Sequence, residues 1–169
     1  MKILKEGYHN MSHSILIIGA GAAGSVVAQK CAQMAQFGEI HLASRRIISC
    51  EQVQKLCDKP IHIYELDANI ADDVASLIER TQAKLVINMA LPYQDLSIMA
   101  GCLKAKAHYM DTANYEPEDE AKFEYSWQWN LHDDFKTAGL TAILGCGFDP
   151  GVTNAYCQYA NIHFFDEIQ

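Results

Sequence analysis

The sequence predicts an α/β fold in which one doubly wound parallel sheet is covered by helices. Strand-like and helix-like segments alternate along the 169 residues, which is typical of a parallel sheet. An apolar run at 15–18 turns into a glycine-rich segment at 19–24 and then into a helix-forming one. A second run, 85–90, is apolar almost throughout, as expected of a central strand that is buried on both faces.

The first half of the chain predicts three strands and three helices. The strand at 15–18 precedes a helix, and further strands are expected at 40–43 and 61–67. Ser49 is a plausible cap for a helix at about 49–57. Apolar residues recur at helical spacing in the first helix (Val26, Val27, Cys31, Met34 and Ala35) and in the third, from about 71 to 80 (Val74, Leu77 and Ile78).

The second half predicts three more strands, at 85–90, 108–111 and 141–144. A helix from about 93 to 104 follows the first of them. A long helix is expected between about 117 and 137, because Pro117 suits a first helical turn and Gly139 suits a helix exit. After Gly145 the glycine-rich segment 145–151 precedes a short helical stretch that reaches about residue 160.

The glycines at 19, 21 and 24 have the G-x-G-x-x-G spacing of a dinucleotide-binding turn. Gly19 permits the tight turn, Gly21 lets the backbone approach a pyrophosphate, and Gly24 lets the helix pack against the sheet. The first free N–H groups of that helix would face the phosphates. Such a spacing also arises in structural turns, but here it lies between a strand and a helix, so we expect nucleotide binding.

The end of the second strand indicates which dinucleotide is bound. Ser44, Arg45 and Arg46 stand where an NAD-selective domain carries an acidic residue for the ribose 2′-hydroxyl. A guanidinium offers paired donors and a full charge to a 2′-phosphate. NADP(H) is therefore the expected cofactor, and the alternative is that the two arginines are a solvated loop pair.

Ligands of a doubly wound sheet bind outside the carboxyl ends of its strands. This rule selects residues 88–93, 111–115 and 145–151, and it places 66–68 where an adenine ring would lie. Tyr93, Asp111 and Cys146 all fall at such ends, and a tyrosine hydroxyl or a carboxyl group there can hydrogen-bond an amine or imine and move protons. Asn88 and Pro92 are equally well explained as turn residues, and Asp111 as a cap.

Composition narrows the classes of function. The 50% of hydrophobic residues suffice for one well-packed domain, and the formal net charge of -8 argues against nucleic acid or an anionic membrane as partner. No apolar run approaches the ~20 residues that span a bilayer, so a cytoplasmic protein is expected. The six cysteines form no C-x-x-C pair, so neither a metal site nor a disulfide framework is indicated. Most of them are expected to be small buried residues, with Cys146 as the exception. A G-x-S-x-G elbow is absent, which disfavours hydrolysis.

Four segments, 19–24, 88–95, 109–117 and 145–154, resemble the saccharopine dehydrogenase superfamily. Within it they are most similar to the carboxynorspermidine (carboxyspermidine) dehydrogenase branch, and the aromatic run 123–129 strengthens this narrower match. The resemblance covers most of the chain from about residue 14. It implies a Rossmann domain followed by a mixed α/β catalytic domain, through which members of the family commonly dimerise.

The resemblance also implies an activity. Aspartate β-semialdehyde and a diamine, putrescine or 1,3-diaminopropane, would form an imine, and NADPH would reduce it to carboxyspermidine or carboxynorspermidine. Two alternatives are a reductase of the saccharopine type and a non-catalytic NADP(H)-binding module. The partners would be small molecules, and the complete protein would be a homodimer.

The chain is therefore expected to be the amino-terminal part of a longer enzyme. Residues 1–13 would be an extension, 14–150 the NADP(H)-binding domain, and 151–169 the start of the catalytic domain, which is otherwise absent. The predicted catalytic residues are Tyr93, Asp111 and Cys146. The predicted cofactor-binding residues are Gly19, Gly21, Ala22, Ala23, Gly24, Ser44, Arg45, Arg46, Asp67, Ala68, Asn88, Ala90, Pro92, Gly145, Asp149, Pro150 and Gly151.

Overall fold

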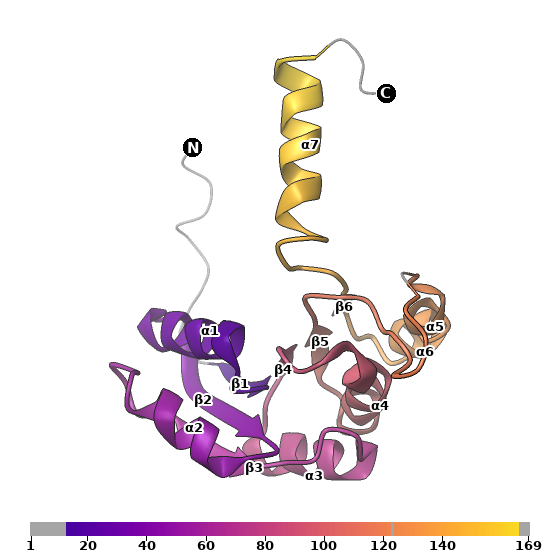
Figure 1. The fold of residues 1–169 in the computed structure, drawn as a ribbon. Coiled ribbons are helices and arrows are strands. Elements are labelled where there is room, and N and C mark those ends of the chain that lie inside the picture. The colour runs from indigo at the N-terminus through magenta and orange to yellow at the C-terminus, as the bar shows by residue number, and fades with distance from the viewer. Residues whose placement is uncertain (1–12, 123, 166–169) are drawn as a thin grey trace.

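The described residues, 13–122 and 124–165 of a computed structural model, form a six-stranded parallel sheet (Figure 1). Its strand order is β3-β2-β1-β4-β5-β6, the order of a doubly wound dinucleotide-binding sheet. The strands are β1 (His13–Ile18), β2 (Phe37–Ser44), β3 (His62–Glu65), β4 (Leu85–Asn88), β5 (His108–Met110) and β6 (Ala142–Ile143). The predicted fold class is confirmed.

Seven α-helices and one 3₁₀ turn are assigned in the described residues. They are α1 (Ala22–Gln33), α2 (Ile47–Gln54), α3 (Ala71–Thr81), η1 (Pro92–Gln94), α4 (Asp95–Ala105), α5 (Ser126–Trp129), α6 (His132–Thr137) and α7 (Val152–His163). Figure 1 shows α1 and α3 on opposite sides of the strands. The sheet is therefore covered on both faces, as its apolar strands require.

The central strand β1 explains how the two cores form. Leu16 and Ile18 pack in the cluster that contains residues of α3 and α4, whereas Ile15 and Ile17 pack in the cluster that contains residues of α1 and α2. Successive side chains of a strand point to opposite faces, so an uninterrupted apolar run fills both cores. Each core then fixes one layer of helices.

Helix α1 packs through its small residues, which corrects the apolar face expected from the sequence. Val26 is 55% exposed and Met34 40% exposed. The buried positions are Gly24, Ala28, Cys31 and Ala32. Small side chains let the helix axis approach the sheet closely, so the larger apolar residues lie outside the contact.

Helix α2 begins two residues before its expected start. Its N-cap is Arg46, which makes no side-chain capping bond, and Ser49 lies inside the helix. The prediction that Ser49 caps this helix is therefore wrong. Helix α3 follows the sequence closely, because its buried residues include Val74, Leu77 and Ile78.

The long helix expected over 117–137 is wrong in its first half. In the described residues of that region, helix is assigned only to α5 and α6. The preceding segment instead folds back on α5: the Tyr115 N–H donates to Gln128 Oε1 at 3.1 Å, and Lys122 Nζ lies 5.0 Å from the centre of the Trp127 ring. The exposed acidic residues 118–120 supply no apolar face for a helix to bury. The expected exit at Gly139 is confirmed by its φ of +68°.

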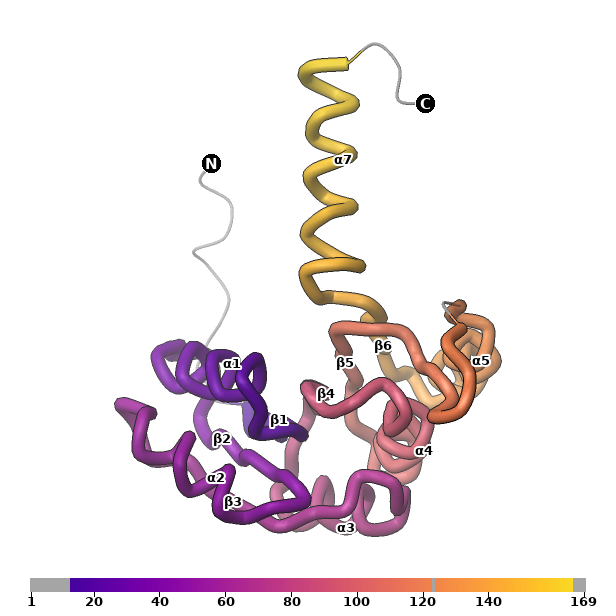
Figure 2. The backbone as a smooth tube through the Cα atoms, in the orientation of Figure 1, coloured from indigo at the N-terminus to yellow at the C-terminus, as the bar shows by residue number. Residues whose placement is uncertain are grey.

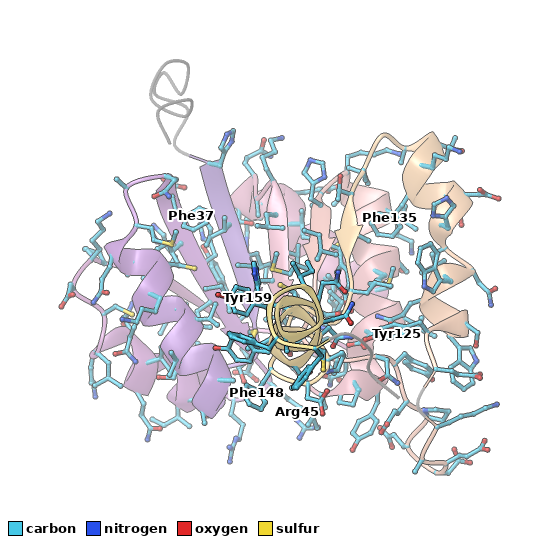
Figure 3. The ribbon with its side chains drawn as sticks, turned by 90° about the horizontal axis from the view of Figure 1, so that it is seen from above. Phe37, Arg45, Tyr125, Phe135, Phe148 and Tyr159 are labelled. Atoms are coloured by element: carbon cyan, nitrogen blue, oxygen red, sulfur yellow. The ribbon has the colours of Figure 1, made fainter. Side chains whose placement is uncertain are left out.

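Helix α7 projects away from the sheet (Figures 1 and 2). Figure 3, which looks down on the molecule, shows this helix end-on. None of its residues is buried, and Tyr156, Tyr159 and Ile162 are among the exposed large apolar residues. The predicted helical stretch is thus present, and it lies outside the two cores.

Candidate active site

A cleft of about 540 Å³ lies at the carboxyl ends of β1, β2 and β4, and the segment that follows β3 also contributes to it. The order of the sheet reverses between β1 and β4, and ligands of doubly wound sheets bind at this reversal. The lining residues are Ile18, Gly19, Ala20, Gly21, Ser44, Arg45, Arg46, Leu66, Ala68, Asn69, Met89, Ala90, Leu91, Tyr93, Gln94 and Glu118. Segments far apart in the sequence therefore meet here, as the sequence predicts.

The glycines of the first turn differ in what surrounds them. A Cβ atom at Gly19 would collide with the backbone of Met89 and Ala90, and one at Gly24 would collide with the carbonyl of Gly19. A Cβ atom at Gly21 would meet no atom within 4 Å. Gly21 is the N-cap residue of α1 and lines the cleft. The turn is thus closely packed beneath and open above, which fits a pyrophosphate on the N-terminus of α1.

The end of β2 carries the positive charge of the cleft. Ser44, Arg45 and Arg46 all line it, and both arginines are exposed. Neither arginine belongs to an ion pair within 13–122 and 124–165. Two guanidinium groups that are free to accept an anion fit a ribose 2′-phosphate.

Several other predicted cofactor residues have structural partners. Asp67 accepts hydrogen bonds from the backbone N–H of Asn69 at 3.0 Å and from its side-chain amide at 2.9 Å. Asn88 is buried, and its Oδ1 accepts the N–H of Ala90 at 2.9 Å. Asn88 therefore holds the turn that forms one side of the cleft. Before residue 145, six predicted cofactor residues are not among those that line the cleft: Ala22, Ala23, Gly24, Asp67, Asn88 and Pro92.

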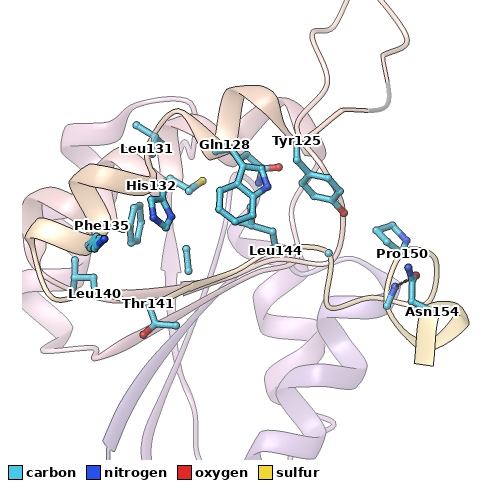
Figure 4. A pocket seen from close by; sticks show the side chains of 16 residues that line it. Tyr125, Gln128, Leu131, His132, Phe135, Leu140, Thr141, Leu144, Pro150 and Asn154 are labelled. Carbon is cyan, nitrogen blue, oxygen red and sulfur yellow. Dashed lines mark hydrogen bonds between the residues drawn. The ribbon is translucent and has the colours of Figure 1, made fainter. Parts of the chain in front are cut away.

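The loop at 145–151 borders a second, largely apolar cavity of about 770 Å³. Figure 4 shows Tyr125 and Pro150 at one end of this cavity and Phe135 and Leu140 at the other. Gly145, Pro150 and Gly151, predicted from the sequence to hold the cofactor, line this cavity and not the cleft. Gly145 has a φ of +64°, a left-handed backbone conformation that favours glycine. Asp149 accepts a hydrogen bond from the Thr153 hydroxyl at 2.9 Å.

The three predicted catalytic residues lie in different settings. Tyr93 is exposed and lines the cleft. Asp111 is 1% exposed, and its Oδ1 accepts the N–H of Gly145 at 2.6 Å. Cys146 is exposed, and its N–H donates to the Asp111 carbonyl at 2.9 Å. The structure thus brings Asp111 and Cys146 together, with the carboxyl group of Asp111 below the surface.

Asp111 belongs to a buried network that includes a second carboxyl group. Gln128 Nε2 donates to Asp111 Oδ2 at 2.6 Å and lies 3.5 Å from Asp95 Oδ2. The side-chain amide of Asn88 donates to Asp95 Oδ1 at 2.7 Å and to the Tyr109 hydroxyl at 3.1 Å. All five residues are buried.

Two buried carboxyl groups in one network do not ionise equally. Burial and the nearby charge of Asp111 raise the pKa of Asp95 to about 8, against the opposing effect of the Asn88 hydrogen bond. Burial also raises the pKa of Asp111, but bonds from Gly145, Tyr109 and Gln128 favour its ionised form. At neutral pH the proton of this pair is therefore expected on Asp95, because the hydrogen bonds to Asp111 favour the ionised form of that group.

The raised pKa of Asp95 predicts how the stability of the fold depends on pH. The pKa of Asp95 is about 8 in the folded chain against an ordinary value of 3.8, so folding takes up a proton between these values. The free energy of unfolding should fall as the pH rises from about 4 to about 8, by at most about 1.4 kcal/mol per pH unit for one proton. Urea unfolding of Asp95→Asn should show a flatter pH dependence than the wild type. Asp73→Asn, at an exposed position, should keep the pH dependence of the wild type. Equal pH dependence of the free energy of unfolding in all three proteins would contradict the raised pKa of Asp95.

Several residues of the site are not predicted from the sequence, and Glu118 and Gln128 are two of them. Glu118 reaches the cleft from the segment predicted to be a helix, and no sequence pattern places it there. Gln128 is 1% exposed. In the sequence it stands between Trp127 and Trp129 and is noted only as part of an aromatic run. Trp129 is 59% exposed, so the aromatic run gives no signal that the polar residue inside it is buried. Phe123, part of that run, lies outside the described residues.

The expectation that Cys146 is the one exposed cysteine is wrong in one position, because Cys157 is exposed as well. Cys31, Cys50 and Cys102 are buried, Cys57 is intermediate, and Cys146 and Cys157 are exposed. Burial raises the pKa of the Cys50 thiol to about 11. No cluster of three or more His, Cys, Asp or Glu suited to a metal occurs in the described part of the chain. The helices of that part include none of the length and hydropathy that a bilayer crossing requires.

The sheet order, the open turn at Gly21 and the cleft at the strand reversal define a dinucleotide-binding domain. Residues 15–143 match the saccharopine dehydrogenase NADP-binding domain family, and the chain belongs to this family. The resemblance noted in the sequence is thereby confirmed. NADP(H) is the expected cofactor and also the cofactor that the family's domain binds.

Curated relatives share this part of the chain. It is 54% identical over 155 residues to the carboxyaminopropylagmatine dehydrogenase of Synechocystis sp., covering 91% of this chain and 39% of that protein. It is 38% identical over 169 residues to the carboxynorspermidine synthase of Vibrio alginolyticus, covering 92% of this chain and 41% of that protein. The chain thus spans about two fifths of the length of these relatives.

Solved structures share the fold. Apo saccharopine dehydrogenase (L-Glu forming) of Saccharomyces cerevisiae superposes with a TM-score of 0.73 at 16% identity, covering 88% of this chain and 30% of that one. The NAD complex of UDP-glucose 4-epimerase from Thermus thermophilus gives a TM-score of 0.58 at 12% identity, covering 78% and 53%. At these identities the likeness concerns the doubly wound fold alone.

Proposed function

We propose that this chain is the cofactor-binding part of an NADPH-dependent reductase that joins an amino-acid aldehyde to a diamine-type amine. The observation that carries the proposal is the cleft, in which an open glycine turn and two arginines converge at the strand reversal. The names of the relatives supply the substrate class, because both describe carboxylated polyamines. Aspartate semialdehyde is the proposed aldehyde.

The second substrate of the proposed reaction is an amine that can condense with the aldehyde. Putrescine and 1,3-diaminopropane each carry a primary amine that can condense with an aldehyde and lose water to form an imine. The name of the 54% identical relative adds agmatine, in which a guanidine group replaces the second amine. Each candidate keeps one cationic end away from the reacting nitrogen. We therefore propose a primary amine with a distal cation as the substrate class.

The residues of the cleft divide into two groups. Gly19, Gly21 and the first amides of α1 would hold the pyrophosphate, and Ser44 with Arg45 and Arg46 would hold the 2′-phosphate. When bound, NADPH would supply a hydride to the imine carbon. The imine nitrogen must also gain a proton, and we propose that it is hydrogen-bonded by the hydroxyl of Tyr93, a residue that lines the cleft.

The segment after β6 would complete the substrate side. Cys146 is exposed at its start, and Asp149, Pro150 and Gly151 follow. We propose that this loop closes the nicotinamide side of the cleft in the complete polypeptide. Because Asp111 is buried beneath Gly145, it would act through the loop.

Arg45→Ala is expected to weaken the binding of NADPH far more than that of NADH. A charge-assisted contact with the 2′-phosphate is worth about 1.5–3 kcal/mol, and NADH lacks that phosphate. Isothermal titration with both cofactors measures the difference. Arg80→Ala, on α3 and outside the cleft lining, removes the same side chain and should change neither affinity. Equal losses of both cofactors in Arg45→Ala would remove the selectivity argument.

The substrate class is tested with the complete gene product. Oxidation of NADPH is followed with aspartate semialdehyde and each of the three amines, and mass spectrometry identifies the secondary amine. Aminoadipate semialdehyde with glutamate tests the saccharopine-type alternative. Turnover of that pair alone would replace our proposal, and tight NADPH binding without turnover of any pair would favour a non-catalytic module.

A further inference from the structure

The side chain of Gln128 joins segments that border both the cleft and the second cavity. We propose that Gln128 is a positioning residue, which acts through Asp111 to hold the loop 145–151 for imine reduction. The inference rests on the proposed function for its reaction, and on the geometry of α5 for its mechanism. Gln128 itself lies below the surface, at 1% exposure.

Both ends of the Gln128 amide have defined partners. Its Oε1 accepts the backbone N–H of Tyr115 at 3.1 Å, which leaves Nε2 to donate to Asp111 Oδ2 at 2.6 Å. A backbone N–H can only donate, so this contact fixes which end of the amide is oxygen. Gln128 thus restrains the loop that carries Glu118 to the cleft and, through Asp111, the loop that begins at Gly145.

The hydrogen-bond network of Gln128 extends to the loops that follow β4 and β6. From the N–H of Gly145, hydrogen bonds run through Asp111 to Gln128, whose amide is also next to Asp95. Asp95 accepts from Asn88, which in turn accepts the N–H of Ala90 beside the cleft. Loops that follow β4, β5 and β6 are therefore connected by buried side chains. Tightly satisfied buried networks of this kind rigidify their surroundings.

The hydrogen bonds at position 128 require a neutral side chain that both donates and accepts a hydrogen bond. The titratable groups around it are Asp95 from α4, Tyr109 and Asp111 from β5 and its end, and Tyr125 before α5. A protonated glutamic acid can replace the amide, because it accepts through one oxygen and donates through the other. An ionised glutamate cannot donate to Asp111, and it adds a negative charge beside that carboxylate.

Gln128→Glu therefore provides a test with a pH signature. Below the pH at which the introduced carboxyl group ionises, kcat should match the wild type, and above it kcat should fall between about 10- and 100-fold. The Kd for NADPH should stay within about twofold, because Gln128 is not among the residues that line the cleft. Gln128→Leu, which can neither donate nor accept, should show the low kcat at every pH. Gln36→Glu, before β2, places the same charge on an exposed site and should follow the wild type.

A second readout does not depend on turnover. The short bond from Gly145 to Asp111 should place the Gly145 amide proton downfield in the ¹H–¹⁵N spectrum, and the resonance should move in Gln128→Glu as the pH rises. Wild-type kcat at all pH values with an unmoved Gly145 resonance would overturn the proposal. If the wild type converts no substrate pair, the proposed function fails, and the Gly145 resonance alone decides whether Gln128 holds the loop.

Discussion

Gly21→Val is expected to weaken NADPH binding at least about a hundredfold while the fold survives. A branched side chain at this position would point into open space above the turn, where the pyrophosphate would lie. Loss of even one or two hydrogen bonds to a charged group costs about 3 kcal/mol, which is about a hundredfold in Kd. Gly21→Ala should give a smaller loss. Cofactor titration measures the affinity, and thermal unfolding reports the fold.

The matched control for this substitution is Gly24→Val. Its side chain would collide with the carbonyl of Gly19, so the melting temperature should fall. The two glycines are three residues apart, but one would bind ligand and the other permits packing. Normal NADPH affinity in Gly21→Val would show that the turn does not hold the phosphates.

Asp111→Ala is expected to lower the free energy of unfolding by about 2–4 kcal/mol. The substitution leaves the Gly145 N–H and the Gln128 amide without their acceptor, and each unsatisfied buried group costs about 1–3 kcal/mol. Removal of the desolvation cost of the buried Asp111 carboxylate offsets part of this loss. Urea unfolding at constant pH gives the difference. The exposed Asp119→Ala should stay within about 0.5 kcal/mol of the wild type, and a similarly small effect at Asp111 would contradict the network.

The sheet and the cofactor side of the site could be predicted because their signals are local. Apolar runs mark the strands, the spacing of three glycines marks the turn, and Ser44 with Arg45 follows a strand end directly. Once the strands are parallel, their carboxyl ends share one edge. The order of the sheet then brings residues 19–21, 44–46 and 89–93 together without any further information.

The other side of the site could not be predicted, because it depends on contacts across the sequence. Pro117 and Gly139 are typical helix boundaries, but the backbone of Tyr115 is held by Gln128, thirteen residues later. The carboxylate of Asp111 likewise accepts the N–H of Gly145, thirty-four residues away. A strand-end carboxylate looks the same in sequence whether it faces a substrate or supports a loop.

The exposed position of α7 determines how different parts of the chain respond to solvent. A helix of 12 residues with no buried side chain gains nothing from a core, and isolated helices of this length are marginal in water. While nothing covers it, α7 should open with little cost in free energy, and its amides should exchange with deuterium long before those of β1. A protease acting at Tyr156 or Tyr159 would then trim this segment and leave the sheet folded.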